Sequence, residues 1–127
     1  MARLHDVVFD AAHAATLARF WAAALDDYSV APYDDEELAR LAAAGIDGPE
    51  DDPSVLLVPA GTGPRIWCTA VPEPKTVKNR VHLDLLAADL EAETARLVGL
   101  GATVQQRLDG WTVLTDPQGN EFCLAAG

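Results

Sequence analysis

Chemistry-bearing residues concentrate in the stretch PEPKTVKNRVHLDL, residues 72–85. It contains Lys75 and Lys78, the two lysines of the chain, followed by Arg80, although the formal net charge of the protein is −11. Such cations can draw in an anionic ligand, or they can pair with acidic loops and clamp two parts of the fold together. We favour the clamp. The stretch ends near His82, a residue that can bind a metal or act as a general base.

The alternation around His82 gives that histidine a carboxylate neighbour. Val81, Leu83 and Leu85 alternate with His82 and Asp84, so the two polar side chains share one face of an expected strand. A histidine supported by a carboxylate suits general base catalysis. The competing interpretation is a histidine that only hydrogen-bonds within a polar surface.

Composition limits the class of protein. With 127 residues and an apolar fraction of 50%, the chain can form one domain with a core. The acidic runs 34–37 and 50–52 are expected to be solvated surface and would repel a polyanion, so nucleic acid is not an expected partner. No apolar stretch approaches the roughly 20 residues that span a bilayer, and residues 1–5 lack the start of a signal peptide. A cytoplasmic protein without a membrane partner is expected.

The two cysteines are expected to be reduced residues of the core. Cys68 and Cys123 lie far apart and have no CxxC spacing. Neither a zinc knuckle nor a redox dithiol is therefore indicated. Cys123 as a nucleophile is not favoured, because no paired base or helix terminus that would lower its pKa can be argued from sequence.

Hydrophobic periodicity predicts two similar halves, each a strand, a helix and then further strands. Leu17, Phe20, Trp21 and Ala24 fall on one helical face in the first half. The expected helices are 14–25, 35–44 and 89–100, and the expected strands are 4–10, 28–31, 54–58, 65–71, 81–86, 103–108, 111–115 and 121–125.

The two halves align best in one register. Placing Asp6 over His82 sets Val7 over Leu83, so the apolar positions of the two strands coincide. Placing His5 over His82 instead would set Val7 over a carboxylate, because a slip of one residue moves every side chain to the other face. We therefore favour Asp6 over His5 as the inward-facing residue of the first strand.

The predicted repeat, the pair Phe20-Trp21, the stretch 72–85 and the ending DPQGNEFCL, residues 116–124, together resemble the glyoxalase-like proteins of the vicinal oxygen chelate superfamily. Among these, the sequence most resembles a metal-poor branch abundant in actinobacteria. The resemblance implies an α+β fold of two tandem βαβββ modules, the glyoxalase/bleomycin resistance/dioxygenase fold, whose cupped sheets enclose a cavity. It covers one domain, 1–127, with a module 1–72 carrying a helical insertion 34–53, a connection 73–79 and a module 80–127.

The resemblance also implies where a metal would bind, at the first and last strands of each module. His82 occupies the histidine ligand position of the second module, and Asp6 the equivalent position of the first. Cys123 and Trp67 stand where the closing strands would carry the other ligands. No metal is therefore favoured; a divalent metal, if bound, would use Asp6, His82 and Glu121.

The side chains in place of the metal ligands predict a cavity for an aromatic guest. Its walls would be Trp67, Cys123 and Trp111, and its polar anchors His82, Asp84, Asp6, Arg65 and Glu121. The favoured function is binding or sequestering an aromatic or hydrophobic metabolite or antibiotic between the modules of a homodimeric, bleomycin-resistance-like protein. The cavity can be completed within one chain or across the dimer. The alternative is a lyase, isomerase or dioxygenase whose catalytic residues are His82, Asp6 and Glu121.

Overall fold

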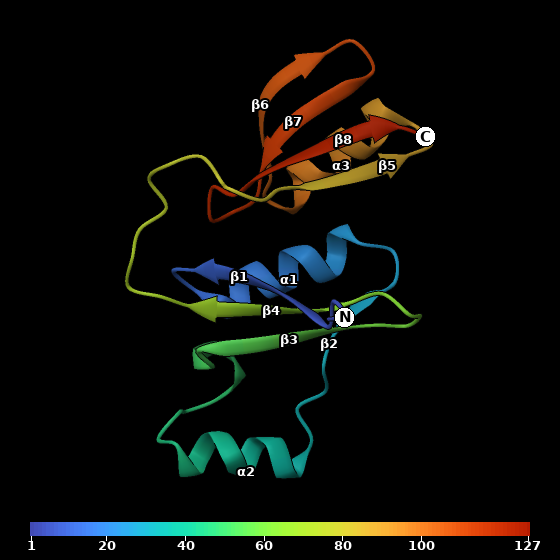
Figure 1. The fold of residues 1–127 in the computed structure, drawn as a ribbon. Coiled ribbons are helices and arrows are strands. Elements are labelled where there is room, and N and C mark those ends of the chain that lie inside the picture. The colour runs from blue at the N-terminus through green and yellow to red at the C-terminus, as the bar shows by residue number, and fades with distance from the viewer. The chain divides into compact units, whose positions relative to one another are not determined.

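The computed structural model describes residues 1–127 and divides into two compact units, Met1–Pro74 and Lys75–Gly127. Each unit contains one four-stranded sheet and a helix between its first two strands (Figure 1). The predicted α+β fold of two βαβββ modules is confirmed. No helix combines the length and the apolar character needed to cross a membrane.

The first unit builds its sheet in the order β1-β4-β3-β2. The outer strand β1 runs parallel to β4, whereas β2, β3 and β4 are joined antiparallel. A helix and a short 3₁₀ turn, Pro49–Asp51, are inserted between β2 and β3. The elements are β1 (Asp6–Ala11), α1 (Ala14–Ala24), β2 (Tyr28–Val30), α2 (Asp35–Ala43), β3 (Ser54–Pro59) and β4 (Arg65–Ala70).

One face of this sheet packs on α1. Leu17, Phe20 and Trp21 of α1 are at most 3% exposed, and the ring of Phe9 on β1 stacks on Trp21 with 5.4 Å between centroids. Burial of each such side chain stabilises the fold by about 1.5–3 kcal/mol. Because side chains alternate along a strand, the neighbours of the buried residues on β1 and β4 point to the opposite face, which α1 leaves uncovered.

The second unit repeats the plan, with its sheet in the order β5-β8-β7-β6. The pair β5 and β8 is parallel, and β6, β7 and β8 form an antiparallel meander. Leu97 of the helix and Leu114, Phe122 and Leu124 of the sheet are at most 1% exposed. The elements are β5 (Leu83–Ala87), α3 (Leu90–Leu100), β6 (Thr103–Leu108), β7 (Trp111–Thr115) and β8 (Glu121–Ala126).

The helices begin at side chains that accept backbone hydrogen bonds. The carboxylate of Asp34 accepts the N–H of Glu37 at 2.9 Å, and that of Asp89 accepts the N–H of Ala92 at 3.0 Å. The ring of His13 has the same role at the start of α1. Such caps satisfy donors that have no partner within the helix, and each is worth about 1 kcal/mol.

Two strands begin later than predicted. Strand β1 begins at Asp6 instead of residue 4, because its parallel partner β4 begins at Arg65, opposite Asp6. Strand β5 begins at Leu83 instead of residue 81, opposite Phe122 of β8. His82 therefore lies immediately before β5, although it was expected within the strand.

Candidate functional site

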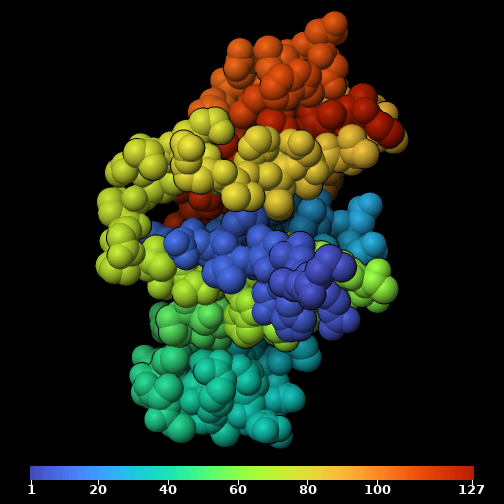
Figure 2. All heavy atoms as spheres, viewed as in Figure 1, coloured from blue at the N-terminus to red at the C-terminus, as the bar shows by residue number.

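A cavity of about 460 Å³ lies within the first unit, between the sheet face that α1 leaves uncovered and the α2 segment, residues 31–53, which connects β2 to β3. Figure 2 shows the α2 segment as the teal spheres at the lower end of the view, and Figure 1 shows its helix below β3. The lining residues come from the loop before α2, from α2, from Asp52 after the 3₁₀ turn, and from β3 and β4. They are Ala31, Pro32, Tyr33, Glu37, Arg40, Asp52, Ser54, Leu56 and Trp67.

The apolar wall of the cavity consists of Leu56 and Trp67, which are paired across β3 and β4. The indole N–H of Trp67 donates to Asp6 Oδ2 at 3.2 Å, and the guanidinium carbon of Arg65 lies 5.9 Å from the ring centroid. These contacts fix the orientation of the ring. Because Trp67 is only partly buried, one surface of an immobilised aromatic side chain remains available to a ligand.

The carboxylate of Asp6 is bound by the guanidinium of Arg65 and by the indole N–H of Trp67. Its carboxylate accepts hydrogen bonds from Arg65 Nε and Nη2, both at 2.8 Å. The Arg65 hydrogen bonds, helped by the one from Trp67 and opposed by burial, lower the pKa of Asp6 from 3.8 to about 2. His5 lies before the strand with its side chain 74% exposed and its Nδ1 3.0 Å from Asp6 Oδ1. Asp6 thus shares a strand face with Arg65 and Trp67.

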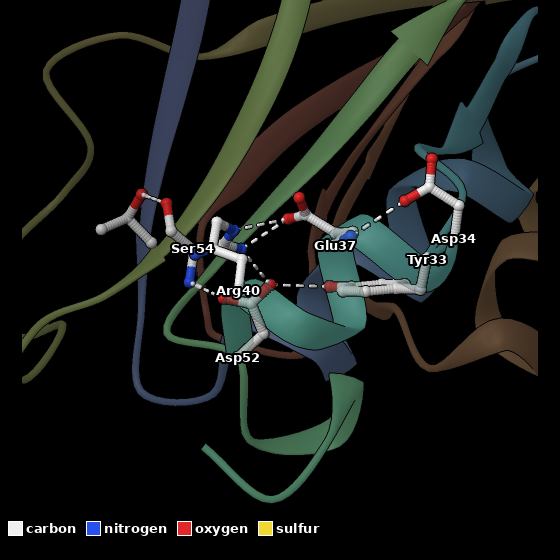
Figure 3. Close-up of polar contacts among 7 residues, drawn as sticks. Tyr33, Asp34, Glu37, Arg40, Asp52 and Ser54 are labelled. Atoms are coloured by element: carbon white, nitrogen blue, oxygen red, sulfur yellow. Dashed lines mark hydrogen bonds and ion pairs between the residues drawn. The ribbon is translucent and has the colours of Figure 1, made fainter. Parts of the chain in front are cut away.

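The polar wall is a network centred on Asp52 (Figure 3). Its carboxylate accepts the Tyr33 hydroxyl at 2.8 Å and the backbone N–H of Ser54 at 3.0 Å. Arg40 Nη2 lies 3.6 Å from the same carboxylate and also binds Glu37. Burial, followed by the hydrogen bond to Asp52, raises the pKa of Tyr33 above its ordinary value. The side chains that form this network point toward one another at the cavity wall; they are those of Tyr33, Glu37, Arg40 and Asp52.

The expectation that both acidic runs are solvated surface was wrong for Asp52, which is 4% exposed. A buried carboxylate is costly unless it is hydrogen-bonded, and here Tyr33, Ser54 and Arg40 supply the partners. Sequence reasoning missed this network because Tyr33 and Asp52 come from opposite ends of the α2 segment. The one local signal was Asp52-Pro53-Ser54, a spacing at which a carboxylate can accept the N–H two residues on.

The second unit brings together His82, Asp84 and Cys123. One ligating atom from each lies within 4.8 Å of the others. Asp84 and Cys123 are opposite one another in the parallel β5–β8 pairing, and His82 Nε2 lies 3.3 Å from Asp84 Oδ1. Alternation predicted the shared face of His82 and Asp84, and the family resemblance implied that Cys123, on the closing strand, lines the same cavity.

Cys123 favours the neutral thiol in this setting. Burial and then the charge of Asp84 raise the pKa of Cys123, while the charge of Lys78 works in the opposite direction. A raised thiol pKa does not suit a nucleophile. Contrary to expectation, Cys123 is only partly buried, whereas Cys68 is a core residue with 0% exposure.

Glu121 is bound by the lysine-bearing segment, residues 75–80. Its carboxylate accepts Lys75 Nζ at 3.1 Å and the backbone N–H of Asn79 at 2.8 Å. Burial works to raise the pKa of Glu121, but these hydrogen bonds and the ammonium group lower it overall. Lys75 also donates to the backbone carbonyl of Val77. The contacts anchor residues 75–79 to the first residue of β8.

Trp111, the other predicted wall residue, begins β7 and is 40% exposed. It pairs with Ala125 across the β7–β8 ladder, and Val113, two residues on, pairs with Cys123. Trp111 therefore shares a strand face with Cys123, at a distance of about 6–7 Å along the strand.

The family assignment rests on a match that covers nearly the whole chain. A model for the glyoxalase-like domain matches residues 6–125. The chain belongs to the glyoxalase-like domain family. Among curated proteins, no sequence matches it significantly.

Several solved structures share the fold of this glyoxalase-like protein. The fosfomycin resistance protein FosX from Mesorhizobium loti is 14% identical with a TM-score of 0.68, covering 100% of this chain and 93% of that one. A glyoxalase/bleomycin resistance protein/dioxygenase family enzyme from Burkholderia phytofirmans PsJN is 14% identical with a TM-score of 0.66, covering 98% of each chain. A mutant FosX from Listeria monocytogenes, complexed with Mn(II) and 1S,2S-dihydroxypropylphosphonic acid, is 12% identical with a TM-score of 0.61, covering 100% and 91%.

The Mn(II) bound to the Listeria neighbour raises the question of whether the predicted ligands of this chain suit a metal. The carboxylate of Asp6 is held by Arg65, and that of Glu121 by Lys75 and Asn79. Binding a cation at either carboxylate would cost these interactions. The side chains of His82, Asp84 and Cys123 interact with one another and with the nearby charge of Lys78, and no other ion pair holds them.

Proposed function

We propose that this glyoxalase-like protein binds an aromatic or hydrophobic small molecule in the cavity of its first unit. The observation that carries the proposal is the placement of Trp67, a partly exposed indole held by Asp6 and Arg65, on the wall of a space of about 460 Å³. Small-molecule sites are commonly about 300–1,000 Å³, mostly apolar, with a few fixed polar groups. The volume lies in that range, and the lining combines the apolar side chains of Leu56 and Trp67 with polar groups held in place by hydrogen bonds.

Each wall of the cavity would have its own role in recognition. The ring of Trp67 and the side chain of Leu56 offer a flat apolar surface on which an aromatic ligand can stack. The opposite wall offers the hydroxyl of Tyr33 and the guanidinium of Arg40, which can fix the orientation of a polar substituent. The guest is thus a planar, mostly apolar compound with a hydrogen-bonding group at one edge, such as an aromatic metabolite or antibiotic.

This binding mode requires no metal. The two carboxylates of the cavity, on Glu37 and Asp52, are already bound by Arg40, Tyr33 and the backbone of Ser54. Recruiting either of them to a cation would break hydrogen bonds to a charged acceptor, worth about 1.5–3 kcal/mol each.

The test is a fluorescence and calorimetric screen of the purified chain against aromatic metabolites and antibiotics. Binding should change the emission of Trp67, and Trp67→Ala should weaken the affinity by roughly 30-fold, because removal of an aromatic anchor costs about 2 kcal/mol. The matched control is Trp111→Ala on the second unit, which should leave the affinity unchanged. A panel without any binder, or a binder insensitive to Trp67→Ala, would refute this site.

An enzyme is the second candidate, and the observation that favours it is the 3.3 Å separation of His82 Nε2 and Asp84 Oδ1. In that function His82 would act as a general base oriented by Asp84. Asp6, another member of the predicted catalytic set, is engaged by Arg65. Turnover of an oxygenated substrate that is abolished in His82→Ala and reduced in Asp84→Asn would favour this candidate over simple binding.

A further inference from the structure

We propose that the guest of the first-unit cavity carries a protonated nitrogen and that Glu37 of α2 is the residue that selects it. This inference rests on the proposed function, because it concerns the same cavity, and it adds the charge of the guest and the group that recognises that charge. The cavity wall presents hydrogen-bond acceptors that no donor of the chain satisfies, and a protonated amine supplies donors and positive charge together.

Glu37 has one carboxylate oxygen that the chain leaves available. Arg40 Nε and Nη2 both donate to Glu37 Oε1, and no hydrogen bond or ion pair holds Oε2 (Figure 3). The side chain of Glu37 lines the cavity and is 38% exposed, so a ligand can reach it. An ionised carboxylate accepts hydrogen bonds and cannot donate them. Oε2 therefore offers the guest a negatively charged acceptor.

The hydroxyl of Tyr33 is a second acceptor on the same wall. It donates its one proton to Asp52 Oδ2 at 2.8 Å. Burial, followed by the hydrogen bond to Asp52, raises the pKa of Tyr33, so the phenol keeps that proton at neutral pH. The oxygen retains a lone pair, whereas its proton is already used. A ligand group that meets this hydroxyl must therefore be a donor.

The charged residues of the cavity wall include one more carboxylate than guanidinium groups. Glu37 and Asp52 are the acidic lining residues, and Arg40 is the basic one. Arg40 is shared between the two, since it binds Glu37 and lies 3.6 Å from Asp52. The guanidinium beside Trp67, that of Arg65, is neutralised by Asp6. A guest with one positive charge would balance the site, whereas an anionic guest would add to the excess.

The apolar wall and the surrounding segment also favour a cation. The face of an indole ring carries the negative part of its quadrupole, so Trp67 attracts a positively charged aromatic group more strongly than a neutral one. The α2 segment contains eight acidic residues and one basic residue, and its field raises the concentration of cations at the cavity. The guest is therefore a planar aromatic compound with a protonated amine at one edge.

The test is a calorimetric titration of the full chain at neutral pH with three probes that share a naphthalene ring: naphthylmethylamine, naphthylmethanol and naphthylacetate. The first is a cation, the second is neutral and the third is an anion. The amine should bind about three- to tenfold more tightly than the alcohol, as expected for a hydrogen bond to a half-exposed carboxylate. The acetate should bind more weakly than either.

Glu37→Gln separates recognition by Glu37 from the general negative field. It should remove the preference for the amine, leave the affinity for the alcohol unchanged, and strengthen binding of the acetate, because it weakens the hold of this side chain on Arg40. The matched control is Glu36→Gln, which removes the same charge from the neighbouring, exposed position of α2, outside the cavity lining. That variant should keep the wild-type order of the three probes.

The outcomes separate this inference from the proposed function. If the alcohol or the acetate binds as tightly as the amine and loses affinity in Trp67→Ala, the cavity binds aromatic molecules without selecting a cation, and only the inference is overturned. If none of the probes binds at millimolar concentration, the cavity does not take a planar aromatic amine and the inference is again wrong, while the proposed function depends on the wider screen. A preference for the amine that survives Glu37→Gln, or that Glu36→Gln removes equally, would assign the selectivity to the field of the acidic segment and overturn the role of Glu37.

Discussion

Asp6 and Arg65 form a two-point ion pair across the first rung of the parallel β1–β4 ladder. Arg65 Nε and Nη2 each donate to one carboxylate oxygen of Asp6 at 2.8 Å, and the two residues are direct partners in the strand register. Planar, bidentate pairing of this kind carries geometric specificity as well as energy. The pair therefore fixes the start of β1 and, through the hydrogen bond from Trp67, one wall of the cavity.

Acid should weaken the fold through this pair. The pKa of Asp6 is about 2 in the folded chain against an ordinary 3.8, so between these values the unfolded chain binds more protons at this carboxyl. The contribution of Asp6 to stability is complete above about pH 4 and is lost as the pH falls toward 2. Urea unfolding from pH 5 to pH 2 should show a shallower decline in Arg65→Gln than in the wild type. Arg107→Gln, which removes an exposed pair with Glu91, should retain the wild-type pH dependence at Asp6.

Helix α3 offers a matched pair of leucines for testing the core of the second unit. Leu97 is 0% exposed and Leu100, three residues later, is 38% exposed. Leu97→Ala should lower the free energy of unfolding by about 2–5 kcal/mol, because it removes buried methyl groups and leaves a cavity. Leu100→Ala should change it by about 0.5 kcal/mol or less. Equal shifts of the urea midpoint would contradict the packing of α3 on its sheet.

Two glycines at the end of α3 should respond to alanine with opposite signs. Gly99 lies in the helix with open space where a Cβ would be, so Gly99→Ala should stabilise the chain by about 0.5–1 kcal/mol. Gly101 has φ +122°, and an added Cβ would lie 3.3 Å from Pro117 Cγ. Gly101→Ala should destabilise by about 1 kcal/mol or more. Thermal unfolding of the two variants in parallel measures both signs.

The helices could be predicted from sequence because their signals are local. The shared face of Leu17, Phe20 and Trp21 predicted a helix over 14–25, and the structure has one at Ala14–Ala24. Strand starts were less predictable, since β1 and β5 begin where their parallel partners begin, and a single sequence does not show which segments pair.

The candidate sites show the same difference between local signals, which the sequence reveals, and contacts between distant segments, which it does not. Alternation predicted that His82 and Asp84 share a face, because both lie in one short segment. The approach of Cys123 depends on the register between β5 and β8, and the cavity of the first unit depends on how the α2 segment meets the sheet. Both are consequences of tertiary pairing, which periodicity within one segment cannot reveal.

The anchoring of the lysine-bearing segment, residues 75–80, within the second unit can be tested through Glu121, which holds both Lys75 and the backbone N–H of Asn79. Residues 75–78 are exposed and in no helix or strand, so these contacts are what restrains the segment against β8. Glu121→Gln removes the charge that strengthens both hydrogen bonds, and hydrogen bonds to a charged group contribute about 1.5–3 kcal/mol each.

Limited proteolysis with trypsin measures the opening of the segment, since the protease can cleave after Lys75, Lys78 and Arg80. If cleavage follows local opening, a loss of about 1.4 kcal/mol should accelerate it roughly tenfold in Glu121→Gln. Glu91→Gln removes a carboxylate of the same unit that pairs with the exposed Arg107, and it should leave the rate unchanged. Similar rates in the two variants would mean that Glu121 does not anchor the connection. Faster cleavage confined to Glu121→Gln would instead identify the carboxylate as a structural anchor.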